Sequence, residues 1–484
     1  ANECRRKGEF MAHRKVVLCL LGAALATSMI SGCSGKKSDP VTVTVWTYYN
    51  GDQLDAFNDL TEKFNDTVGK KDGITVETKS LGTAEDLEQN VLAAVNGEVG
   101  ASEVPNIFSA YSDTAYTMDQ KDMLVDLSDY LTDKEKDEYV EEYLKEGDFS
   151  DDGSIKIFPV AKSTELLFLN DTDWQKFAKE TGAQYEDLQT VEGLVETAEK
   201  YYNWTDSQTP EADDGKALFG RDAMANYLLV GAKELGCDIF GVKDGKMTLN
   251  FDEDIIRKLW DNYYVPYVKG YFSAFGRFRS DDVKTGNVLG YVGSTSSATF
   301  FPTQVSDDSG AAYDIDLKVL PCPKFKDGDD YAVQQGAGMV VTKGSEDEIK
   351  ASIEFLKWFT QSENNIEFSV GSGYLPVTKE ANNIEKIKSV DSDISSSMEE
   401  ILTESEAEIN DNNLYYMHAF ENGNDARTVL QEAFGDTAQQ DRNTVDERIA
   451  QGESAEEAEA EFLSDEYFEQ WYQNVLSKLQ AYEG

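Results

Sequence analysis

Three large aromatic side chains end the first predicted strand of the chain. Trp46, Tyr48 and Tyr49 follow an alternating run that begins at Val41, at a position where a turn is normally small and polar. Aromatic faces cover the apolar C–H faces of a sugar ring, and neighbouring acidic or amide groups bind its hydroxyls. These rings therefore offer a wall for a sugar pocket, although an aromatic side chain at a strand end more often lies in the core or at its rim.

Polar stretches follow two later predicted strands in the same way. Tyr111-Ser112-Asp113 comes after residues 107–110, and a serine-rich segment, residues 293–298, follows residues 288–292. In an open α/β sheet, ligand-binding groups lie on loops beyond the carboxyl ends of the strands. The serine-rich segment adds hydroxyls and the free backbone N–H groups of a predicted helix start. Together these stretches indicate a site for a polar ligand.

Signals for catalysis are weak. His418 is the one histidine after the predicted leader, so a Ser-His or Cys-His nucleophile would depend on it, and neither Cys237 nor any serine has the context of a nucleophile elbow. The sequence contains no CxxC, no His/Cys cluster and no lysine-containing phosphate loop. We therefore expect a protein that is not an enzyme, with no metal and no cofactor. Because the chain has 92 acidic residues, an exported glycosidase that uses a carboxylate pair stays the alternative.

The scaffold that must position these residues alternates β-branched runs with amphipathic stretches, which is the pattern of α/β domains with largely parallel sheets. The predicted strands are residues 41–46, 74–78, 107–110, 166–170, 288–292, 315–320 and 338–342. The predicted helices include residues 52–65, 85–96, 191–202 and 348–360, the first of them capped by Asp52. The acidic tail, residues 441–484, repeats aromatic and aliphatic side chains at i+4 steps, so we expect it to be helical and to pack on the body; an acidic disordered tail is the alternative.

The first residues have the features of an export signal. Arg14-Lys15 precede an uncharged run, residues 16–30, that ends in Ile30-Ser31-Gly32-Cys33 and is too short to stay in a bilayer as a helix. These last four residues resemble the lipobox of bacterial lipoproteins, in which the cysteine becomes the lipidated first mature residue; an ordinary secretory cleavage is the alternative. We expect residues 1–32 to be an upstream extension and a lipoprotein signal peptide, and residues 33–40 to be a tether lipidated at Cys33.

The net charge restricts the possible binding partners, and the cysteine count restricts the possible disulfides. The chain carries 44 basic and 92 acidic residues, a formal charge of −48, and shows no basic run. Nucleic acid is therefore excluded as a partner, since binding to phosphates needs a basic face. So high a charge favours a soluble, self-repelling protein, and we expect a monomer. Cys237 and Cys322 either form one disulfide or stay free, because their spacing alone does not decide.

Several segments, taken together and in order, resemble one family. They are Trp46-Thr47-Tyr48-Tyr49-Asn50-Gly51, Phe64-Asn65, Pro105-Asn106-Ile107-Phe108, Leu124-Val125-Asp126-Leu127-Ser128, residues 158–170 (FPVAKSTELLFLN), residues 355–360 (FLKWFT) and residues 371–378 (GSGYLPVT). The sequence closely resembles the family-one extracellular solute-binding proteins of ABC importers, and the resemblance covers nearly the whole chain after the leader. The lipobox supplies the membrane tether that such receptors use in bacteria without an outer membrane.

The resemblance implies a fold and its division. The family has an α/β, two-lobe, periplasmic-binding-protein-like fold of class II, similar to maltose-binding protein, in which the ligand binds between the lobes and a hinge closes them. The first lobe would comprise residues 41–158 plus 321–372, and the second residues 159–320 plus 373–484. Prolines near all three crossings fit a restrained hinge, because proline fixes φ.

The resemblance also implies a function: an extracellular, lipid-anchored protein of the cell membrane that captures a mono- or oligosaccharide and delivers it to ABC transporter permease subunits. The expected ligand-binding residues are Trp46, Tyr48, Tyr49, Asp113, Glu165, Asn226, Tyr227, Ser294, Ser296, Ser297, Gln335 and Tyr374. Because side chains alternate along a strand, Tyr48 would point the same way as Trp46 and Tyr49 would point away, so we expect Trp46 and Tyr48 to contact the ligand before Tyr49. Glycerol 3-phosphate or another phosphorylated polyol is the alternative ligand; a phosphate would need a cation, and Lys162, Arg221, Arg277 and Arg279 are the candidates.

Overall fold

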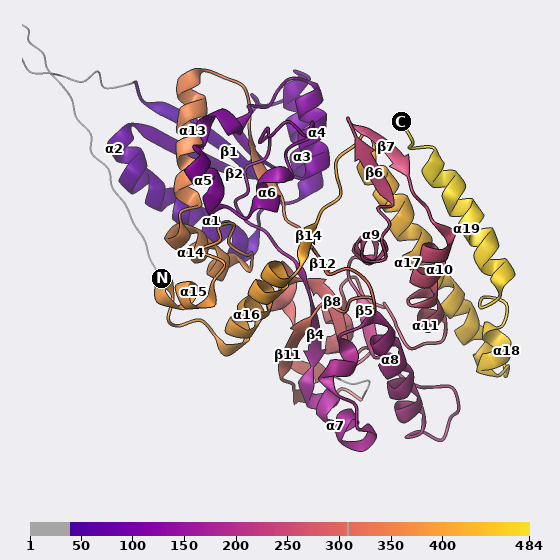
Figure 1. Ribbon diagram of the computed structural model, residues 1–484. Helices are drawn as coiled ribbons and strands as arrows, with labels where there is room; N and C mark the ends of the chain where they lie inside the picture. The colour runs from indigo at the N-terminus through magenta and orange to yellow at the C-terminus, as the bar shows by residue number, and fades with distance from the viewer. Residues whose placement is uncertain (1–38, 307–308) are drawn as a thin grey trace, which may run out of the picture. The chain divides into compact units, whose positions relative to one another are not determined.

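The computed structural model describes residues 39–306 and 309–484. The predicted signal peptide and the predicted lipidation site at Cys33 lie outside these residues. Within the described ranges, no helix is both long enough and apolar enough to cross a membrane. Residues 40–484 form one compact unit, built on two four-stranded sheets (Figure 1).

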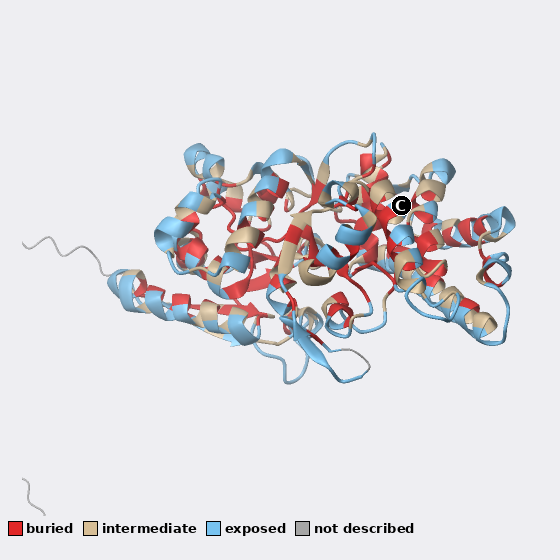
Figure 2. Cartoon of the chain, turned by 90° about the horizontal axis from the view of Figure 1, so that it is seen from below, coloured by how far each residue is buried: buried red, intermediate tan, exposed pale blue. Residues whose placement is uncertain are grey.

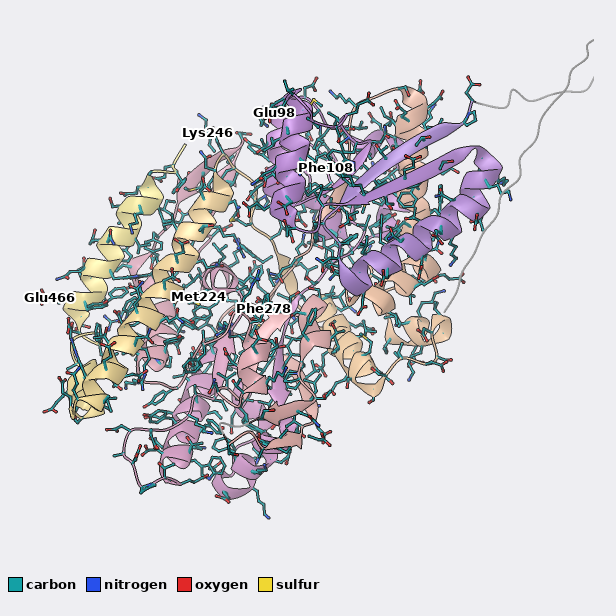
Figure 3. All side chains as sticks on the ribbon, turned by 180° about the vertical axis from the view of Figure 1, so that it is seen from behind. Glu98, Phe108, Met224, Lys246, Phe278 and Glu466 are labelled. Carbon is teal, nitrogen blue, oxygen red and sulfur yellow. The ribbon has the colours of Figure 1, made fainter. Side chains whose placement is uncertain are left out.

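The first sheet has the strand order β13-β3-β1-β2. Its strands are β1 (Val41–Thr47), β2 (Ile74–Ser80), β3 (Ile107–Ala110) and β13 (Gly338–Val341). Helices α1 (Gly51–Phe64), α13 (Glu346–Phe359) and α14 (Ser362–Ser372) cover one face, and α3 (Ala84–Val95) and α4 (Ser112–Gln120) cover the other. Side chains of β1 alternate between the two cores: Val43 and Val45 join the first, and Trp46 joins the second. Figure 3 labels Phe108, which packs beside Trp46.

The second sheet has the strand order β11-β4-β8-β5. Its strands are β4 (Glu165–Asn170), β5 (Phe219–Arg221), β8 (Gly290–Ser294) and β11 (Leu317–Pro321). The larger core lies on the face covered by α7 (Asp171–Thr181), α8 (Val191–Asp206), α9 (Met224–Glu234), α10 (Glu253–Asp261), α11 (Tyr264–Val268), α17 (Gly423–Ala450), α18 (Ala455–Glu459) and α19 (Asp465–Gln480). Helices α12 (Arg279–Lys284) and α16 (Ser396–Asp411) pack on the other face. Helices are buried toward the sheets and exposed on their outer sides (Figure 2).

The remaining α-helices and strands are short. They are α2 (Lys70–Asp72), α5 (Asp133–Glu138), α6 (Glu141–Lys145), α15 (Ile384–Val390) and the strand pairs β6 (Phe240–Lys243) with β7 (Lys246–Leu249), β9 (Gln304–Ser306) with β10 (Ala312–Asp314), and β12 (Tyr331–Val333) with β14 (Asn413–Tyr415).

The expectation of largely parallel sheets is wrong for the second sheet. Strand β4 runs antiparallel to both of its neighbours, β8 and β11, and only β5 and β8 pair in parallel. In the first sheet, β13 alone is reversed, against β3. Each reversed strand enters its sheet at the edge where its neighbours have their carboxyl ends, so Glu165 pairs with Ser294 and Gly338 with Ala110. Residues at the start of β4 and just before β13 therefore lie at the carboxyl ends of the neighbouring strands, where α/β sheets commonly bind their ligands.

Segments that lead into the two sheets meet side by side. Antiparallel bridges join Phe158 to Met339, Ser163 to Gln335, and Lys162 to Leu375. Tyr374 and Val377, which the predicted division assigns to the second lobe, pack in the first-sheet core. They do so because α14 leads directly into the segment that pairs with Lys162.

Other local predictions have mixed outcomes. The predicted helices appear as α1, α3, α8 and α13, and the acidic tail is helical and packs on the large core through Trp471, Val475 and Leu479. Asp52 is not the cap of α1: it lies in the first turn, where a carboxylate interacts favourably with the helix dipole, and Asn50 precedes the helix. Strands β8 and β11 begin two residues later than predicted. Cys237 and Cys322 are both free thiols.

Candidate functional site

A tyrosine cluster marks the carboxyl edge of the first sheet. Tyr48 follows β1 and Tyr111 follows β3, and their rings stack at 5.9 Å with an interplanar angle of 20°. The hydroxyl of Tyr48 lies 3.2 Å from that of Tyr374. Tyr111 is 46% exposed, although large apolar rings are usually covered. Burial raises the pKa of Tyr374 to about 12, so its hydroxyl keeps its proton at neutral pH. The cluster therefore offers one open aromatic face backed by a second ring.

Asp113 follows Tyr111 by two residues, in the first turn of α4. Its Oδ1 is buried and has no hydrogen-bond partner among the described residues. Burial raises the pKa of Asp113 to about 6, and the Arg427 guanidinium opposes that rise. Since a buried polar atom is normally hydrogen-bonded, Asp113 is an acceptor without a donor within the chain that the structure describes.

A hydrogen-bonded relay forms the corresponding edge of the second sheet. Arg427, on α17, donates from Nη2 to Asn226 Oδ1 at 2.8 Å, and Asn226 donates from Nδ2 to Glu165 Oε1 at 2.8 Å. Met224, labelled in Figure 3, opens α9 two residues before Asn226. Burial raises the pKa of Glu165 to about 7, and the nearby arginines 221 and 427 oppose that rise. Arg427 is itself electrostatically coupled to both Glu165 and Asp113, so it connects acidic groups from the two sheets.

A small cavity lies behind the relay. Glu165 and Asn226 line it together with Arg221, Glu234 and Cys322, and its volume is about 20 Å³, room for a single water. This apolar and ionic setting desolvates Glu165, which accounts for the raised pKa.

The hydroxyls of the serine-rich segment are hydrogen-bonded within the segment itself. Ser294 Oγ and Ser296 Oγ are 2.8 Å apart, and Ser297 Oγ donates to Ser294 O at 2.8 Å. The predicted helix start is a short 3₁₀ helix, residues Thr295–Phe300, capped by Ser294. A side chain on Gly373 would meet Ser296 O at 3.2 Å, so the segment packs close to the chain that carries Tyr374.

Several buried oxygen atoms without a partner in the described residues gather at these strand ends. They belong to Thr47, Ser109, Asp113, Thr164 and Gln335. Thr47 ends β1, Thr164 directly precedes β4, and Gln335 precedes β13. Unpaired buried oxygens are rare in native proteins, so their concentration at two sheet edges marks a candidate site for a polar ligand.

Four expected aromatic contacts, Trp46, Tyr49, Tyr227 and Tyr374, lie in the cores. Trp46 is 6% exposed among Leu87, Val91 and Phe108, and Tyr49 is 1% exposed on the opposite side of β1. This bears out the alternation that separates Tyr49 from Trp46, but α3 and α4 cover the side on which Trp46 lies. Tyr227 is also buried, with its hydroxyl donating to Leu259 O at 2.8 Å. None of Trp46, Tyr49 and Tyr227 presents an open face, and Tyr374 is 7% exposed in the first-sheet core; that these side chains contact the ligand stays a prediction.

Three of the four candidate phosphate-binding cations are buried against other protein groups, and the fourth, Arg277, is exposed. The Lys162 ammonium is buried against the Glu146 carboxylate, and Arg279 Nη1 lies 2.8 Å from Asp282 Oδ2. The Arg277 guanidinium lies 5.2 Å from the ring centroid of Phe278. Both residues belong to the loop before α12, and Phe278 is labelled in Figure 3. Arg221 is buried over the ring of Tyr227, 4.4 Å from its centroid, and is electrostatically coupled to Glu165.

Arg427 is the contact that sequence reasoning missed. It lies on α17, 201 positions after Asn226, and no local motif marks it. Tyr111 stood in a noted stretch but was not among the expected contacts; its place after β3 was the available signal. His418 is exposed, with its ring 4.7 Å from that of Tyr416. The described residues contain no group of three or more potential metal ligands.

Comparison with known proteins decides the family. A family model for bacterial extracellular solute-binding proteins matches residues 59–393, more than half of the chain. The chain belongs to the bacterial extracellular solute-binding proteins. The resemblance noted in the sequence is thereby confirmed. A search of curated protein sequences finds no significant match to this solute-binding protein.

Solved structures confirm the fold of this solute-binding protein. UgpB from Mycobacterium tuberculosis, in complex with glycerophosphocholine, aligns with a TM-score of 0.64 and 19% identity, over 92% of this chain and 98% of the other. The cyclic alpha-maltosyl-1,6-maltose binding protein from Arthrobacter globiformis gives 0.63 and 17%, over 91% and 100%. A family 1 extracellular solute-binding protein from Alicyclobacillus acidocaldarius gives 0.62 and 11%, over 92% and 99%. The predicted two-lobe α/β fold of the maltose-binding-protein type is confirmed.

Proposed function

We propose that this solute-binding protein captures a neutral mono- or oligosaccharide between the carboxyl edges of its two sheets. The observation that carries the proposal is the arrangement around Tyr111. Its open ring is stacked on Tyr48, the unpaired Asp113 acceptor follows two residues later, and Arg427, on α17, interacts electrostatically with both Tyr111 and Asp113. A sugar needs these three features: a face for its C–H groups, an acceptor for its hydroxyl hydrogens and a donor for its hydroxyl oxygens.

The charge of the site favours a neutral ligand over a phosphate. Asp113 and Glu165 are its acids, and Arg427 is coupled to both of them. A phosphate would have to compete with these carboxylates for Arg427, since Lys162 and Arg279 are paired with Glu146 and Asp282 and Arg221 is buried over the ring of Tyr227. The formal charge of −48 repels an anion further, although a local site can override it.

A glycerophosphodiester with a quaternary ammonium group is the second candidate. Stacked tyrosines next to a carboxylate attract such a cation, and Arg427 could then receive the phosphate. The glycerophosphocholine complex of the UgpB structure makes this ligand a necessary member of any screen. A simple phosphorylated polyol such as glycerol 3-phosphate would use Arg427 but would leave the tyrosine face unused.

We further propose that the protein delivers its ligand to ABC transporter permease subunits, as a monomer held on the outer face of the cell membrane by lipid on Cys33. The support is the family and the lipobox-like sequence before Cys33. The lobes would comprise residues 41–158 plus 321–372 and residues 159–320 plus 373–484, except that Tyr374 and Val377 pack with the first lobe, and the segments paired around Lys162 would join the lobes. Closure requires contacts from both lobes, because only a ligand that binds the closed state more tightly shifts the equilibrium. Family members are binding proteins, and we expect no turnover.

A thermal-shift screen tests the proposal. The ligands are maltose, maltotriose, glycerol 3-phosphate and glycerophosphocholine, and each ligand that stabilises the protein is then analysed by chromatography for breakdown. We expect stabilisation by a neutral sugar without products. Stabilisation only by the two phosphates would replace the sugar by the second ligand class, and sugar breakdown that stops in Asp113→Asn or Glu165→Gln would show a glycosidase.

Tyr111→Ala provides the local check. Losing a stacked aromatic face should weaken binding by about 1 kcal/mol, roughly fivefold, while the unliganded melting temperature changes little because Tyr111 is nearly half exposed. The matched control is Tyr482→Ala, a partly exposed tyrosine just after α19. Equal affinities for the two variants would place the ligand elsewhere.

A further inference from the structure

Lys162 has an unusual position for a lysine. Its side chain is 1% exposed, whereas lysines are almost never fully buried unless they are paired. The ammonium group contacts the Glu146 carboxylate, donates to Gly336 O at 3.1 Å, and lies 5.7 Å from the ring centroid of Tyr143. A carboxylate, a backbone carbonyl and an aromatic ring therefore surround one buried charge.

The backbone of Lys162 joins the segments that connect the two sheets. Lys162 and Leu375 exchange two hydrogen bonds, of 3.1 and 2.6 Å, and the next residue, Ser163, exchanges two with Gln335, of 3.0 and 2.9 Å. The side chain adds the bond to Gly336 within the same segment as Gln335. Lys162 thus holds two neighbouring segments through its backbone and side chain together.

Glu146 anchors this junction to the first-sheet body. It ends α6, whose Tyr143 and Leu144 belong to the first-sheet core. The oxygen that contacts Lys162 also accepts from Gln334 Nε2 at 3.0 Å. Glu146 therefore fixes both Lys162 and the residue that precedes Gln335.

Gly336 transmits the constraint to its neighbour. Its φ of +97° is a conformation that favours glycine. A side chain there would lie 3.0 Å from Ala161 O and 3.3 Å from Lys162 Cα, so the turn is pressed against the lysine backbone. Because Gln335 enters this turn, its direction depends on how closely Gly336 packs. Gln335 Oε1 is one of the buried oxygens without a partner among the described residues.

We infer that Lys162 is a positioning residue: paired with Glu146, it holds the Gly336 carbonyl and so keeps the Gln335 amide directed into the ligand site. The inference rests on the proposed function, since it concerns the same site. It also assigns Lys162 a role different from the phosphate-binding one considered from the sequence. The lysine acts on the ligand through Gln335 and does not contact it.

The test removes the charge pair as a unit. Lys162→Met alone would leave Glu146 buried without its cation and could unfold the protein. In Lys162→Met/Glu146→Gln no charge is left unpaired, and the glutamine can still accept from Gln334. The matched control is Lys343→Met/Asp122→Asn, an exposed ion pair beside the same sheet. Titration calorimetry measures affinity for the ligand found in the screen, and melting without ligand reports stability.

We expect the Lys162/Glu146 double variant to melt within a few degrees of the wild type but to bind the ligand about tenfold more weakly. A loss of that size corresponds to the contribution of one hydrogen bond to affinity. Gln335→Ala should show the same loss, and combining it with the double variant should add less than about twofold, because linked residues are not additive. The control pair should bind normally.

The outcomes separate the two proposals. A wild-type protein that binds neither sugar nor glycerophosphodiester refutes the proposed function, and this inference with it. A wild type that binds, together with a Gln335→Ala variant that binds equally well, places Gln335 outside the site and overturns the inference alone. A weakened Gln335→Ala with a normal double variant shows that Lys162 is merely structural, as do losses that multiply when the changes are combined.

Discussion

The two sheet edges that form the site differ in how their polar groups are satisfied. On the second sheet, Glu165, Asn226 and Arg427 bond to one another, and so do Ser294, Ser296 and Ser297, so that most of its polar groups are satisfied although Thr164 Oγ1 and Arg221 Nε have no partner in the described chain. On the first sheet, Tyr111 is open, and Asp113 and Gln335 carry buried oxygens without partners in the described chain.

The difference indicates a division of work. Groups that already bond to each other are preorganised and lose little on meeting a ligand, so they fix geometry. Groups left unpaired gain a full hydrogen bond from the ligand, so they supply affinity. We therefore expect substitutions at the second-sheet edge to change stability most, and substitutions at the first-sheet edge to change binding most.

The largest expected effect is that of Arg427→Met. The change removes the donor to Asn226 and the cation that faces Glu165 and Asp113, leaving two carboxyl groups without compensation. Unpaired buried charges cost about 3 kcal/mol or more, so the free energy of unfolding should fall by about that amount in urea. Binding should also weaken, because the geometry of the relay is lost.

A matched arginine on the same helix provides the control. Arg448 pairs with Glu461 at the surface of α17, and Arg448→Met should lower the free energy of unfolding far less than Arg427→Met does. If the two variants prove equally stable, the relay does not hold the second-sheet edge together.

The second effect concerns pH. Burial raises the pKa of Glu165 to about 7, above its unfolded value, so the folded protein binds this proton more tightly than the unfolded chain does. The free energy of unfolding should therefore decrease as pH rises from about 4.5 to 7, by about 2–3 kcal/mol from this group.

Glu165→Gln isolates that contribution. The amide oxygen can still accept from Asn226, but the group no longer ionises. In paired urea denaturations, the free energy of unfolding of the variant should therefore rise relative to that of the wild type as pH increases from 5 to 8. Asp113 titrates in both proteins and cancels in the difference. Parallel pH profiles for the two proteins would mean that Glu165 is ionised at the same pH in both states.

The third effect separates stability from affinity at a single residue. Asp113→Asn removes a buried carboxylate without a partner, which should raise the unliganded melting temperature slightly. It also replaces a charged acceptor by a weaker neutral one, so affinity should fall about tenfold. Calorimetry together with thermal melting measures both. Changes of the same sign in stability and affinity would contradict the idea that Asp113 is held unpaired for the ligand.

Much of the scaffold could be predicted from the sequence, because periodicity reports local burial. The alternation in β1 separated Val45 from Trp46, and the i+4 spacing of Trp471 and Val475 marked a packed helix. The reversed strands could not be predicted in this way. Strand direction depends on the sheet edge at which the chain arrives, and a hydrophobic pattern is the same in either direction.

The individual contacts of the site were harder to predict, for a related reason. A pattern shows that Trp46 and Tyr48 share a side of β1 but not that helices cover one and leave the other at an open edge. Arg427 is brought to Asn226 by the packing of α17 on α9, across 201 positions of chain. Contacts of that range have no local signature.

The smallest expected effect is that of Ser296→Ala. Ser296 Oγ pairs with Ser294 Oγ, and Ser294 Oγ also accepts from the Ser296 backbone N–H at 3.3 Å, a bond that the alanine variant keeps. Stability should fall by less than about 1 kcal/mol, and affinity should change less than about threefold by calorimetry. The comparison with Asp113→Asn decides between the two edges, since both changes remove one polar function from a strand-end loop. If Ser296→Ala weakens binding more than Asp113→Asn does, the second-sheet edge supplies the affinity and the proposed division of work is reversed.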